Sequence, residues 1–275
     1  MPELPETETI ARDLDGAISG RKIKKVSVRK RDVLRGVSSR SLAKRLQDAT
    51  IVRSWRRAKL VVIDLDTGDR LVVQPRFTGA LLIDDGNFRG AELDYSTLRL
   101  ELDDGRALHY ADVRRLGTVA LMNADRFAEY SAKLGIEPLD RSFTAAHLSA
   151  VLQATSQPVK KVLMEQRKIA GIGNIYANEA LWRSRLDPAR EGRSLSEAEI
   201  ARLRDAVVSV LEESIALRGT SFRDYVDVRG ARGGFVDRLA VYGRADEPCP
   251  RCGTTLVDTH AIDARTTVYC PRCQH

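Results

Sequence analysis

The chain ends in Cys249-Pro-Arg-Cys252 and Cys270-Pro-Arg-Cys273, the most specific local pattern among its 275 residues. Each pair has the C-x2-C spacing, and 17 residues separate the two pairs. Paired knuckles of this kind can fold a small hairpin in which four thiolates close a tetrahedral site around one structural Zn2+. Because no secretion signal precedes them, a disulfide reading is disfavoured.

The residues between the knuckles favour two short strands, at Thr254–Val257 and Thr266–Tyr269, which are rich in β-branched and aromatic side chains. Four sulfur ligands leave no open position for a catalytic water, so we expect a structural metal only. His260 and His275 could replace a ligand, but with four cysteines available they are expected to be bystanders.

Composition indicates a polyanionic partner. Lys and Arg outnumber Asp and Glu by 45 to 38, which gives a formal net charge of +7. This excess favours nucleic acid, although a basic surface can also serve solubility alone. No apolar run reaches the roughly 18 residues that cross a bilayer. We expect a cytoplasmic protein with no membrane partner.

Upstream of the finger the pattern is helical. Thr144 is a plausible cap for a helix over residues 145–153, and Ser196 opens a capping box with Glu199. Apolar residues then recur at helical spacing until Gly219. Residues 159–181 predict a helix-loop-helix, and its loop contains Gly171-Ile-Gly-Asn174. Such a loop could grip a phosphate through backbone amides, or it could be an ordinary turn between helices.

The first half of the chain reads as a helix followed by strands. Residues 3–18 place apolar side chains on one stripe, and Gly20 follows. Short β-rich runs with Asp-Gly turn chemistry between some of them predict a sandwich or flattened barrel. The predicted strands cover residues 23–28, 51–55, 60–65, 71–73, 80–83, 98–102, 107–110 and 118–121.

The fold class is therefore α+β. We expect an N-terminal helix plus an eight-stranded β-sandwich lobe in residues 1–135. A helical lobe should follow in residues 136–240, and a β-hairpin zinc finger in residues 241–275.

The N-terminus, Met1-Pro2-Glu3-Leu4-Pro5-Glu6, offers a nucleophile. Removal of Met1 would leave the secondary amine of Pro2, and a terminal amine has a pKa near roughly 8, well below that of lysine. Such an amine can form a Schiff base, with Glu3 and Glu6 nearby to move protons. Proline and glutamate are also simply good residues for the first turn of a helix.

Together, these segments resemble the formamidopyrimidine-DNA glycosylases. The resemblance is collinear, spans essentially the whole chain and rests on six matches. They are PELPE at the start, Arg56-Arg-Ala-Lys59, Asp112-Val-Arg114-Arg-Leu116-Gly117, the GIGNIYANEAL stretch from Gly171, Val241-Tyr-Gly-Arg244 and the four-cysteine finger. Endonuclease VIII shares this plan, so the resemblance fixes the superfamily more firmly than the lesion.

The resemblance implies a bifunctional DNA glycosylase and AP lyase of base excision repair. By analogy, Pro2 attacks C1′ of the damaged nucleotide, Glu3 handles protons at the sugar, and Glu6 supports them. Lys59 matches a family lysine that approaches the lesion phosphate and assists base removal. β- and then δ-elimination would release the sugar. No catalytic metal and no organic cofactor are implied.

The resemblance also implies that residues 136–240 form a helical DNA-binding domain with a helix-two-turn-helix element, and it implies particular DNA contacts. Asn174 and Arg265 match residues that hold backbone phosphates beside the flipped nucleotide, and Lys160 matches another basic contact. Arg114 matches the residue that faces the orphaned base. Two positions depart from the family pattern, because Leu116 stands where Phe is usual and Phe77 stands at the Met position.

We hypothesise that Phe77 supplies the stacking surface that Leu116 cannot, although both could be core residues of the β-lobe. An inserted side chain of this kind would fill the gap that is left in the DNA duplex when the target nucleotide is extruded. The glycine-rich segment 220–235 matches the loop that closes over an oxidised purine, or it is a plain surface loop.

The expected partner is double-stranded DNA containing oxidised bases or abasic sites, bound by a monomer that associates with the nucleoid. Oxidised purines, namely 8-oxoguanine and formamidopyrimidines, are the expected lesions. Alternatives are an endonuclease VIII-like enzyme for oxidised pyrimidines, a zinc-bearing damaged-DNA-binding protein without lyase activity, and a metal-dependent nuclease. No carboxylate cluster supports the last of these.

Overall fold

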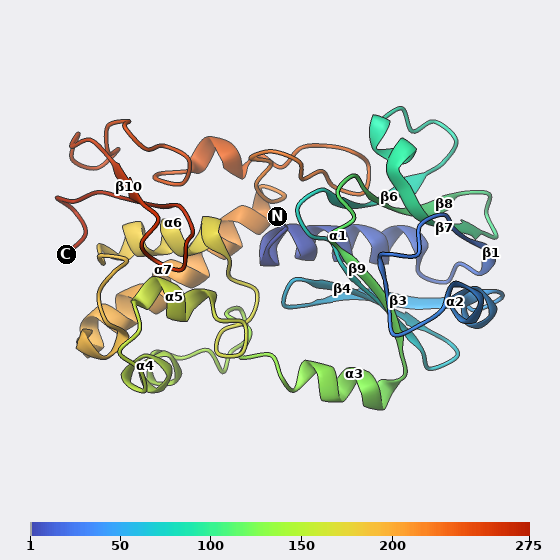
Figure 1. Cartoon of the computed structure of the whole chain (residues 1–275), viewed down its shortest axis with the longest axis horizontal. Coiled ribbons are helices and arrows are strands. Elements are labelled where there is room, and N and C mark those ends of the chain that lie inside the picture. The colour runs from blue at the N-terminus through green and yellow to red at the C-terminus, as the bar shows by residue number, and fades with distance from the viewer. Residues whose placement is uncertain (1) are drawn as a thin grey trace. The chain divides into compact units, whose positions relative to one another are not determined.

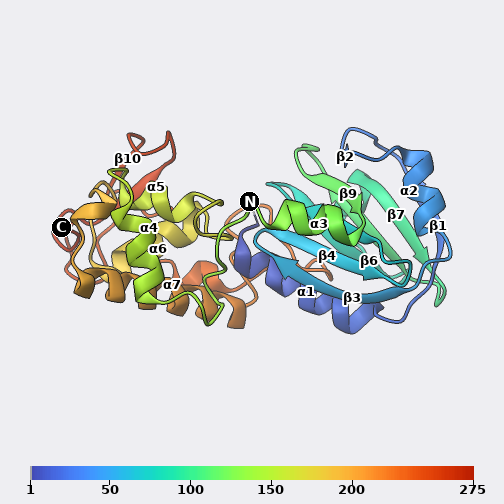
Figure 2. The same ribbon diagram turned by 90° about the horizontal axis from the view of Figure 1, so that it is seen from below.

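The computed structural model describes residues 2–275, and the predicted removal of Met1 lies outside them. The chain forms two compact units (Figures 1 and 2). One, called here the β-lobe, contains the residues up to Ala132 together with Leu217–Val236. The other, called the helical lobe, contains Lys133–Ala216 and Asp237–His275.

Two sheets build the β-lobe, beside helix α1 (Leu4–Ile18). The four-stranded sheet has the order β1 (Ile23–Val28), β7 (Ser96–Leu102), β8 (Ala107–Asp112) and β6 (Gly79–Asp84). The five-stranded sheet has the order β2 (Leu34–Arg35), β9 (Thr118–Met122), β5 (Arg70–Gln74), β4 (Leu60–Leu65) and β3 (Ile51–Arg57). Every pairing is antiparallel except that of β2 with β9.

A large apolar cluster lies between these elements. It joins the buried stripe of α1, which includes Ile10 and Leu14, to Val61 of one sheet and Leu108 of the other. Burial of both sheet faces against one core is what defines a sandwich. Tyr225 belongs to the same cluster, so the segment 217–236 packs on the β-lobe although the helical lobe precedes it in sequence.

The helical lobe contains four α-helices and a hairpin. They are α4 (Ala145–Gln153), α5 (Val159–Met164), α6 (Asn174–Ser184), α7 (Glu197–Ala216), β10 (Val257–Thr259) and β11 (Thr267–Tyr269). Short 3-10 turns cover Gly192–Ser194 and Phe235–Arg238. The predicted caps are confirmed, since Thr144 Oγ1 accepts the His147 N–H at 3.1 Å and the Ser196–Glu199 capping box forms.

All eight predicted strands are present, and the α+β fold class is confirmed. Sequence periodicity missed β2, α2 (Ser39–Leu46), α3 (Ala124–Ser131) and a 3-10 turn at Ala91–Tyr95. These elements are too short for a periodic signal, and α2 buries only Leu42 and Leu46.

The first finger strand was predicted at Thr254–Val257, but β10 begins only at Val257. The correction follows from the knuckle, because the Thr254 carbonyl accepts the Cys249 N–H at 2.8 Å and closes a turn there. Within residues 2–275, no helix is both long and apolar enough to cross a membrane.

Candidate functional site

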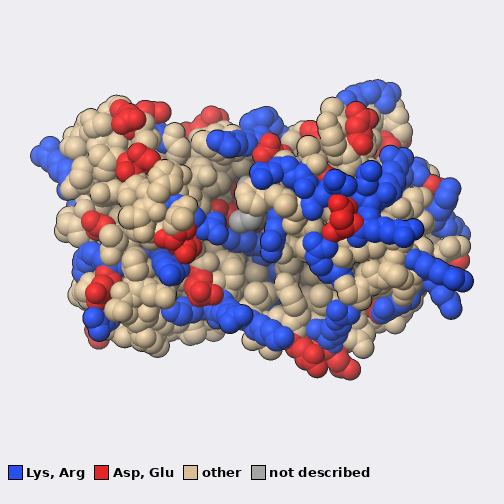
Figure 3. All heavy atoms as spheres, viewed as in Figure 1, with Lys and Arg blue, Asp and Glu red and all other residues tan. Residues whose placement is uncertain are grey.

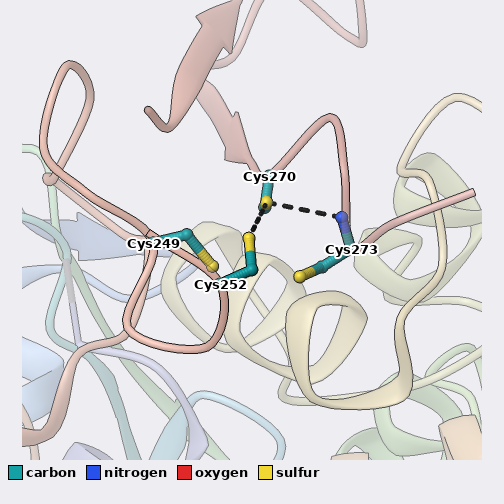
Figure 4. A group of neighbouring side chains, drawn as sticks. All are labelled: Cys249, Cys252, Cys270 and Cys273. Atoms are coloured by element: carbon teal, nitrogen blue, oxygen red, sulfur yellow. Dashed lines mark hydrogen bonds between the residues drawn. The ribbon is translucent and has the colours of Figure 1, made fainter. Parts of the chain in front are cut away.

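The four cysteines meet at one point of the helical lobe (Figure 4). Their sulfur atoms all lie within 4.8 Å of one another, and those of Cys252 and Cys270 are 3.5 Å apart. A tetrahedron with Zn–S bonds of about 2.3 Å has sulfur–sulfur edges of about 3.8 Å. The cluster therefore fits one structural Zn2+, and all four ligand positions would be filled.

The thiols differ in acidity when no cation neutralises them. A hydrogen bond from the Thr254 side chain lowers the pKa of Cys252 to about 6. Burial, followed by hydrogen bonding to the thiols of Cys252 and Cys270, raises the pKa of Cys273 to about 12. Since each sulfur must bind the metal as a thiolate, zinc binding would release protons.

The first turn of α1 holds the predicted catalytic carboxylates inside the β-lobe. Glu3 and Glu6 are 2% and 1% exposed, and Pro2 beside them is buried. The Glu6 carboxylate accepts the N–H of Glu3 at 2.8 Å through one oxygen and that of Thr220 at 2.8 Å through the other. Glu6 thus fixes the start of α1 and anchors the segment 217–236 to it.

Lys59 lies in the two-residue turn between β3 and β4 and is 8% exposed. Ala58, the other turn residue, has a φ of 54°, which is uncommon for a residue other than glycine. Its carbonyl lies 3.3 Å from the Thr7 hydroxyl, which is also 2.8 Å from the Glu3 carbonyl. Thr7 therefore links the backbone of Glu3 to the turn that carries Lys59.

An ion pair stabilises the same junction. Arg56 donates through Nε to Glu8 at 2.6 Å and through Nη1 to the Ala58 carbonyl at 3.3 Å. Burial opposes ionisation of Glu8, but the charge and hydrogen bonds of Arg56 outweigh it, so the pKa of Glu8 is lowered. The turn of Lys59 is thus attached to α1 through both Thr7 and Arg56.

Two loops at one edge of the β-lobe carry the residues that depart from the family pattern. The 74–79 loop exposes 42% of Phe77, and the 112–117 loop exposes 41% of Leu116. The reading of both as core residues is therefore wrong, because neither side chain is buried. The Arg114 guanidinium stacks over the Phe77 ring at 5.0 Å, which brings the two predicted contacts together.

In the helical lobe, the helix-two-turn-helix segment holds the finger. The Asn174 amide and the Lys160 ammonium both donate to the Thr266 carbonyl, at 3.0 and 3.1 Å, and Lys160 also donates to the Thr267 hydroxyl at 2.6 Å. Arg265, directly before Thr266, is exposed. Lys160 itself is fully buried, so its ammonium group is not part of the protein surface.

The next turns of α6 anchor the rest of the hairpin. Asn178 accepts the Val268 N–H at 2.9 Å, and Glu179 accepts three backbone N–H groups, those of Ala240, Val241 and Tyr242, at 2.8 to 3.0 Å. Burial raises the pKa of Glu179, and the three donors oppose that shift. The segment that enters the finger is thus fixed by one buried side chain.

The segment 217–236 is closed at its base and pinned along its length. The Gly234 N–H donates to the Leu217 carbonyl at 2.8 Å. Arg218 bridges Asp13 of α1 and Asp227 of the segment, at 2.5 Å each. Seven of the residues between Thr220 and Phe235 are nevertheless exposed, among them Phe222 at 38% and Arg229.

Basic side chains gather over the β-sandwich on the face drawn in Figure 3, with few acidic side chains among them. A surface of this kind attracts a polyanion over distances of several ångströms. It agrees with the net charge of +7.

Three family models match the chain in order. The formamidopyrimidine-DNA glycosylase N-terminal domain matches residues 1–119, the H2TH domain of the same enzymes matches 134–226, and a zinc finger found in FPG and IleRS matches 246–275. A formamidopyrimidine-DNA glycosylase of Heliobacterium modesticaldum is 39% identical over the full length of both chains. The chain belongs to the formamidopyrimidine-DNA glycosylase family.

Solved structures of family members have the same fold. The Lactococcus lactis FPG mutant in complex with Fapy-dG-containing DNA superposes with a TM-score of 0.92 at 31% identity, covering all of both chains. The MutM (FPG) protein of Thermus thermophilus gives a TM-score of 0.88 at 35% identity, covering 99% of this chain and 98% of that one. A third structure is the complex of the Lactococcus lactis Fpg with DNA that contains an abasic site. It gives a TM-score of 0.91 at 31% identity, covering 99% of both chains.

Sequence reasoning missed the residues that hold the predicted site residues and the segment 217–236 in place. Thr7 and Thr78 have no titratable group and belong to no motif, and Arg218 and Asp227 find each other only in the folded segment. One signal existed for Thr7, because residues at i and i+4 share a helix face and Thr7 follows Glu3 by four.

Proposed function

We propose that the protein is a bifunctional DNA glycosylase and AP lyase that acts on DNA containing formamidopyrimidines or abasic sites. The observation that carries the proposal is the buried start of α1, where the backbone of Glu3, directly after the buried Pro2, is tied through Thr7 to the turn of Lys59. Family membership supports the activity. The order of its three matched segments supports DNA as the partner.

The proposed reaction uses the imino nitrogen that loss of Met1 would free on Pro2. Its lone pair attacks C1′ of the damaged nucleotide as the bond from C1′ to the base breaks, and the proton that the Pro2 nitrogen loses balances the one that the departing base takes up. Glu3 protonates the sugar ring oxygen as the ring opens, which leaves an iminium between Pro2 and C1′. Removal of a C2′ proton then expels the 3′ phosphate, and a second elimination expels the 5′ phosphate.

Lys59 would assist departure of the base, and Glu6 would keep the start of α1 in place. Asn174, Arg265 and, through the finger, Lys160 would hold backbone phosphates, contacts that give affinity without sequence preference. Phe77, Arg114 and Leu116 would fill the space left by the extruded nucleotide. The zinc ion would keep the finger folded and take no part in the chemistry.

We infer further that 8-oxoguanine is among the substrates and that the enzyme acts as a monomer on nucleoid DNA in the cytoplasm. Three domains along the chain, in residues 1–135, 136–240 and 241–275, would carry catalysis, DNA binding and the finger, with the segment 217–236 of the second packed on the β-lobe. The length of the segment between Gly219 and Phe235 supports a purine-directed enzyme over one for oxidised pyrimidines.

Borohydride trapping tests the proposal. Duplexes with formamidopyrimidine, 8-oxoguanine or an oxidised pyrimidine should be incubated with the enzyme and reductant, and the adduct mapped by peptide mass spectrometry. A stable adduct on a peptide that begins at Pro2 is expected with the two purine lesions. Adduct formation on a lysine, or a salt-sensitive complex without any adduct, would overturn the mechanism.

Variants at the β3–β4 turn sharpen the test. Lys59→Met should slow base release from formamidopyrimidine DNA while preformed abasic DNA is still cleaved, because the lysine is proposed to act before elimination. Arg57→Met alters the neighbouring residue of β3 and serves as the matched control. Equal losses on both substrates for Lys59→Met would remove its assigned role.

A further inference from the structure

Thr78 connects the two loops that are proposed to enter the DNA. Its hydroxyl belongs to the 74–79 loop and donates to the Asp112 carboxylate at 2.6 Å. The same oxygen accepts the backbone N–H of Arg114 at 3.0 Å. The Thr78 hydroxyl therefore holds both Asp112, at the start of the 112–117 loop, and the backbone of Arg114.

Asp112 is the buried anchor of this connection, with 2% of its surface exposed. Its second oxygen accepts the Gly117 N–H at 2.9 Å and the Tyr110 hydroxyl at 3.0 Å. Asp112 thus binds both ends of its own loop and the neighbouring loop at once. A buried carboxylate with three donors is a well-satisfied and rigid group.

Two glycines make room for the Tyr110 hydroxyl, which donates to Asp112. A Cβ on Gly117 would lie 1.9 Å from the Tyr110 hydroxyl oxygen, and one on Gly79 would lie 2.7 Å from it. Burial, with the charge of Asp112 next, raises the pKa of Tyr110 well above its ordinary value, so the hydroxyl keeps its proton and remains a donor. The ends of both loops therefore close around one hydroxyl.

Both loops also hold strained backbone. Phe77 has a φ of 45° and Arg115 a φ of 52°, in the left-handed region that bulky side chains avoid. Such residues persist only where surrounding contacts over-determine them, and they cluster at functional sites. The network of Thr78 and Asp112 supplies those contacts, and its product is the exposed stack of Phe77 under Arg114.

We propose that Thr78 is a positioning residue whose hydroxyl couples the two loops, so that Phe77 and Arg114 enter the duplex as one stacked unit that discriminates the base opposite the lesion. The inference rests on the proposed function. An aromatic ring under the guanidinium limits its orientations and hence the base edges that it can address. Loss of the Thr78 hydroxyl releases the backbone of Arg114. The guanidinium can then take more orientations, and discrimination between opposite bases is weaker.

The test compares Thr78→Val with Thr78→Ser. Valine keeps the shape and removes the hydroxyl, whereas serine restores it. The measurement is kcat/KM for formamidopyrimidine opposite each of the four bases. Thr78→Val should shrink the ratio between the best and worst opposite base by about tenfold, the effect of losing a hydrogen bond to a charged group. Thr78→Ser should keep the ratio within about twofold, a difference smaller than one neutral hydrogen bond makes.

A second readout reports insertion of the stack without catalysis. The fluorescence of 2-aminopurine opposite an abasic analogue rises when the base is unstacked, and Thr78→Val should reduce that rise. Asp66→Asn is the matched control, because Asp66 also binds the backbone of a neighbouring segment, at Thr50, but lies in the β4–β5 turn. It should leave both readouts unchanged.

The outcomes separate the two proposals. If the parent enzyme yields neither adduct nor cleavage, the proposed function fails. If the parent is active and folded Thr78→Val has the parent's ratio and fluorescence, the coupling role is overturned. If Thr78→Val does not fold, Phe77→Leu decides, since removal of the ring should produce the same loss of discrimination.

Discussion

The carboxylate of Glu6 accepts the backbone N–H of Thr220 at 2.8 Å, although the two residues lie 214 positions apart in the chain. Gly219 makes this approach possible, because a Cβ there would lie 3.0 Å from Cγ of Glu6 and its φ of 86° favours glycine. The contact joins the turn that carries Pro2 to the segment proposed to close over the damaged base.

Replacing Glu6 should loosen both parts. In Glu6→Gln, one amide oxygen must satisfy two buried N–H groups, and the free energy of unfolding should fall by about 1–3 kcal/mol. Urea denaturation measures the loss, and hydrogen exchange should show faster exchange at Thr220. Glu129→Gln, on the surface of α3, is the control. Unaltered protection of Thr220 would mean that Glu6 does not anchor the segment.

Zinc content should be one ion per chain. It should decrease as the pH is lowered, because each cysteine must be a thiolate to bind the metal. Cys252→Ser should lose most of the metal and weaken DNA binding. His260→Ala should keep both, since His260 lies outside the four-sulfur cluster. Metal analysis with a colorimetric chelator provides the measurement. Retained zinc in a double variant of Cys252 and Cys273 would contradict the assignment.

Acid should remove a specific part of the stability of α7. The Arg190 hydrogen bond lowers the pKa of Glu199 from 4.5 to about 2, so the stabilisation is present above pH 4.5 and lost as the pH falls toward 2. Because this pair is near the surface, its contribution is only about 1 kcal/mol. Glu199→Gln should therefore be less stable than the parent at pH 6 and similar at pH 2.

Asp205→Asn, an exposed change on the same helix, is the control for that measurement. Thermal or urea unfolding at several pH values gives the comparison. A constant difference between Glu199→Gln and the parent from pH 6 to pH 2 would exclude titration of Glu199 as its cause.

Replacing Lys160 and replacing Arg265 should weaken DNA binding in different ways. Arg265→Ala removes a proposed phosphate contact, so the dependence of log K on log salt should lose about 0.9 of its slope. Lys160→Met removes a buried donor to Thr266 and Thr267, so affinity should fall with little change in slope. Fluorescence anisotropy across a salt series distinguishes the two. A slope change for Lys160→Met would indicate direct contact with phosphate.

Motifs predicted the zinc cluster, the eight strands and the family because each is encoded locally, by spacing, alternation or collinear segments. They did not reveal that Lys160 is buried, since a lysine in a basic stretch reads as exposed. Nor did they reveal the contacts of Thr7, Thr78 and Glu6. Those depend on which distant backbone groups the fold brings to a side chain, and no local pattern records that.

The chain leaves the β-lobe at Ala132. It returns to complete this lobe with Leu217–Val236, after the whole of α4 to α7. During synthesis, the sheets and α1 emerge from the ribosome well before the partner of Glu6 exists. Until then the first turn of α1 lacks its covering segment. A nascent polypeptide released before residue 217 would thus display a sandwich with an open amino-terminal face, a form suited to recognition by chaperones and proteases.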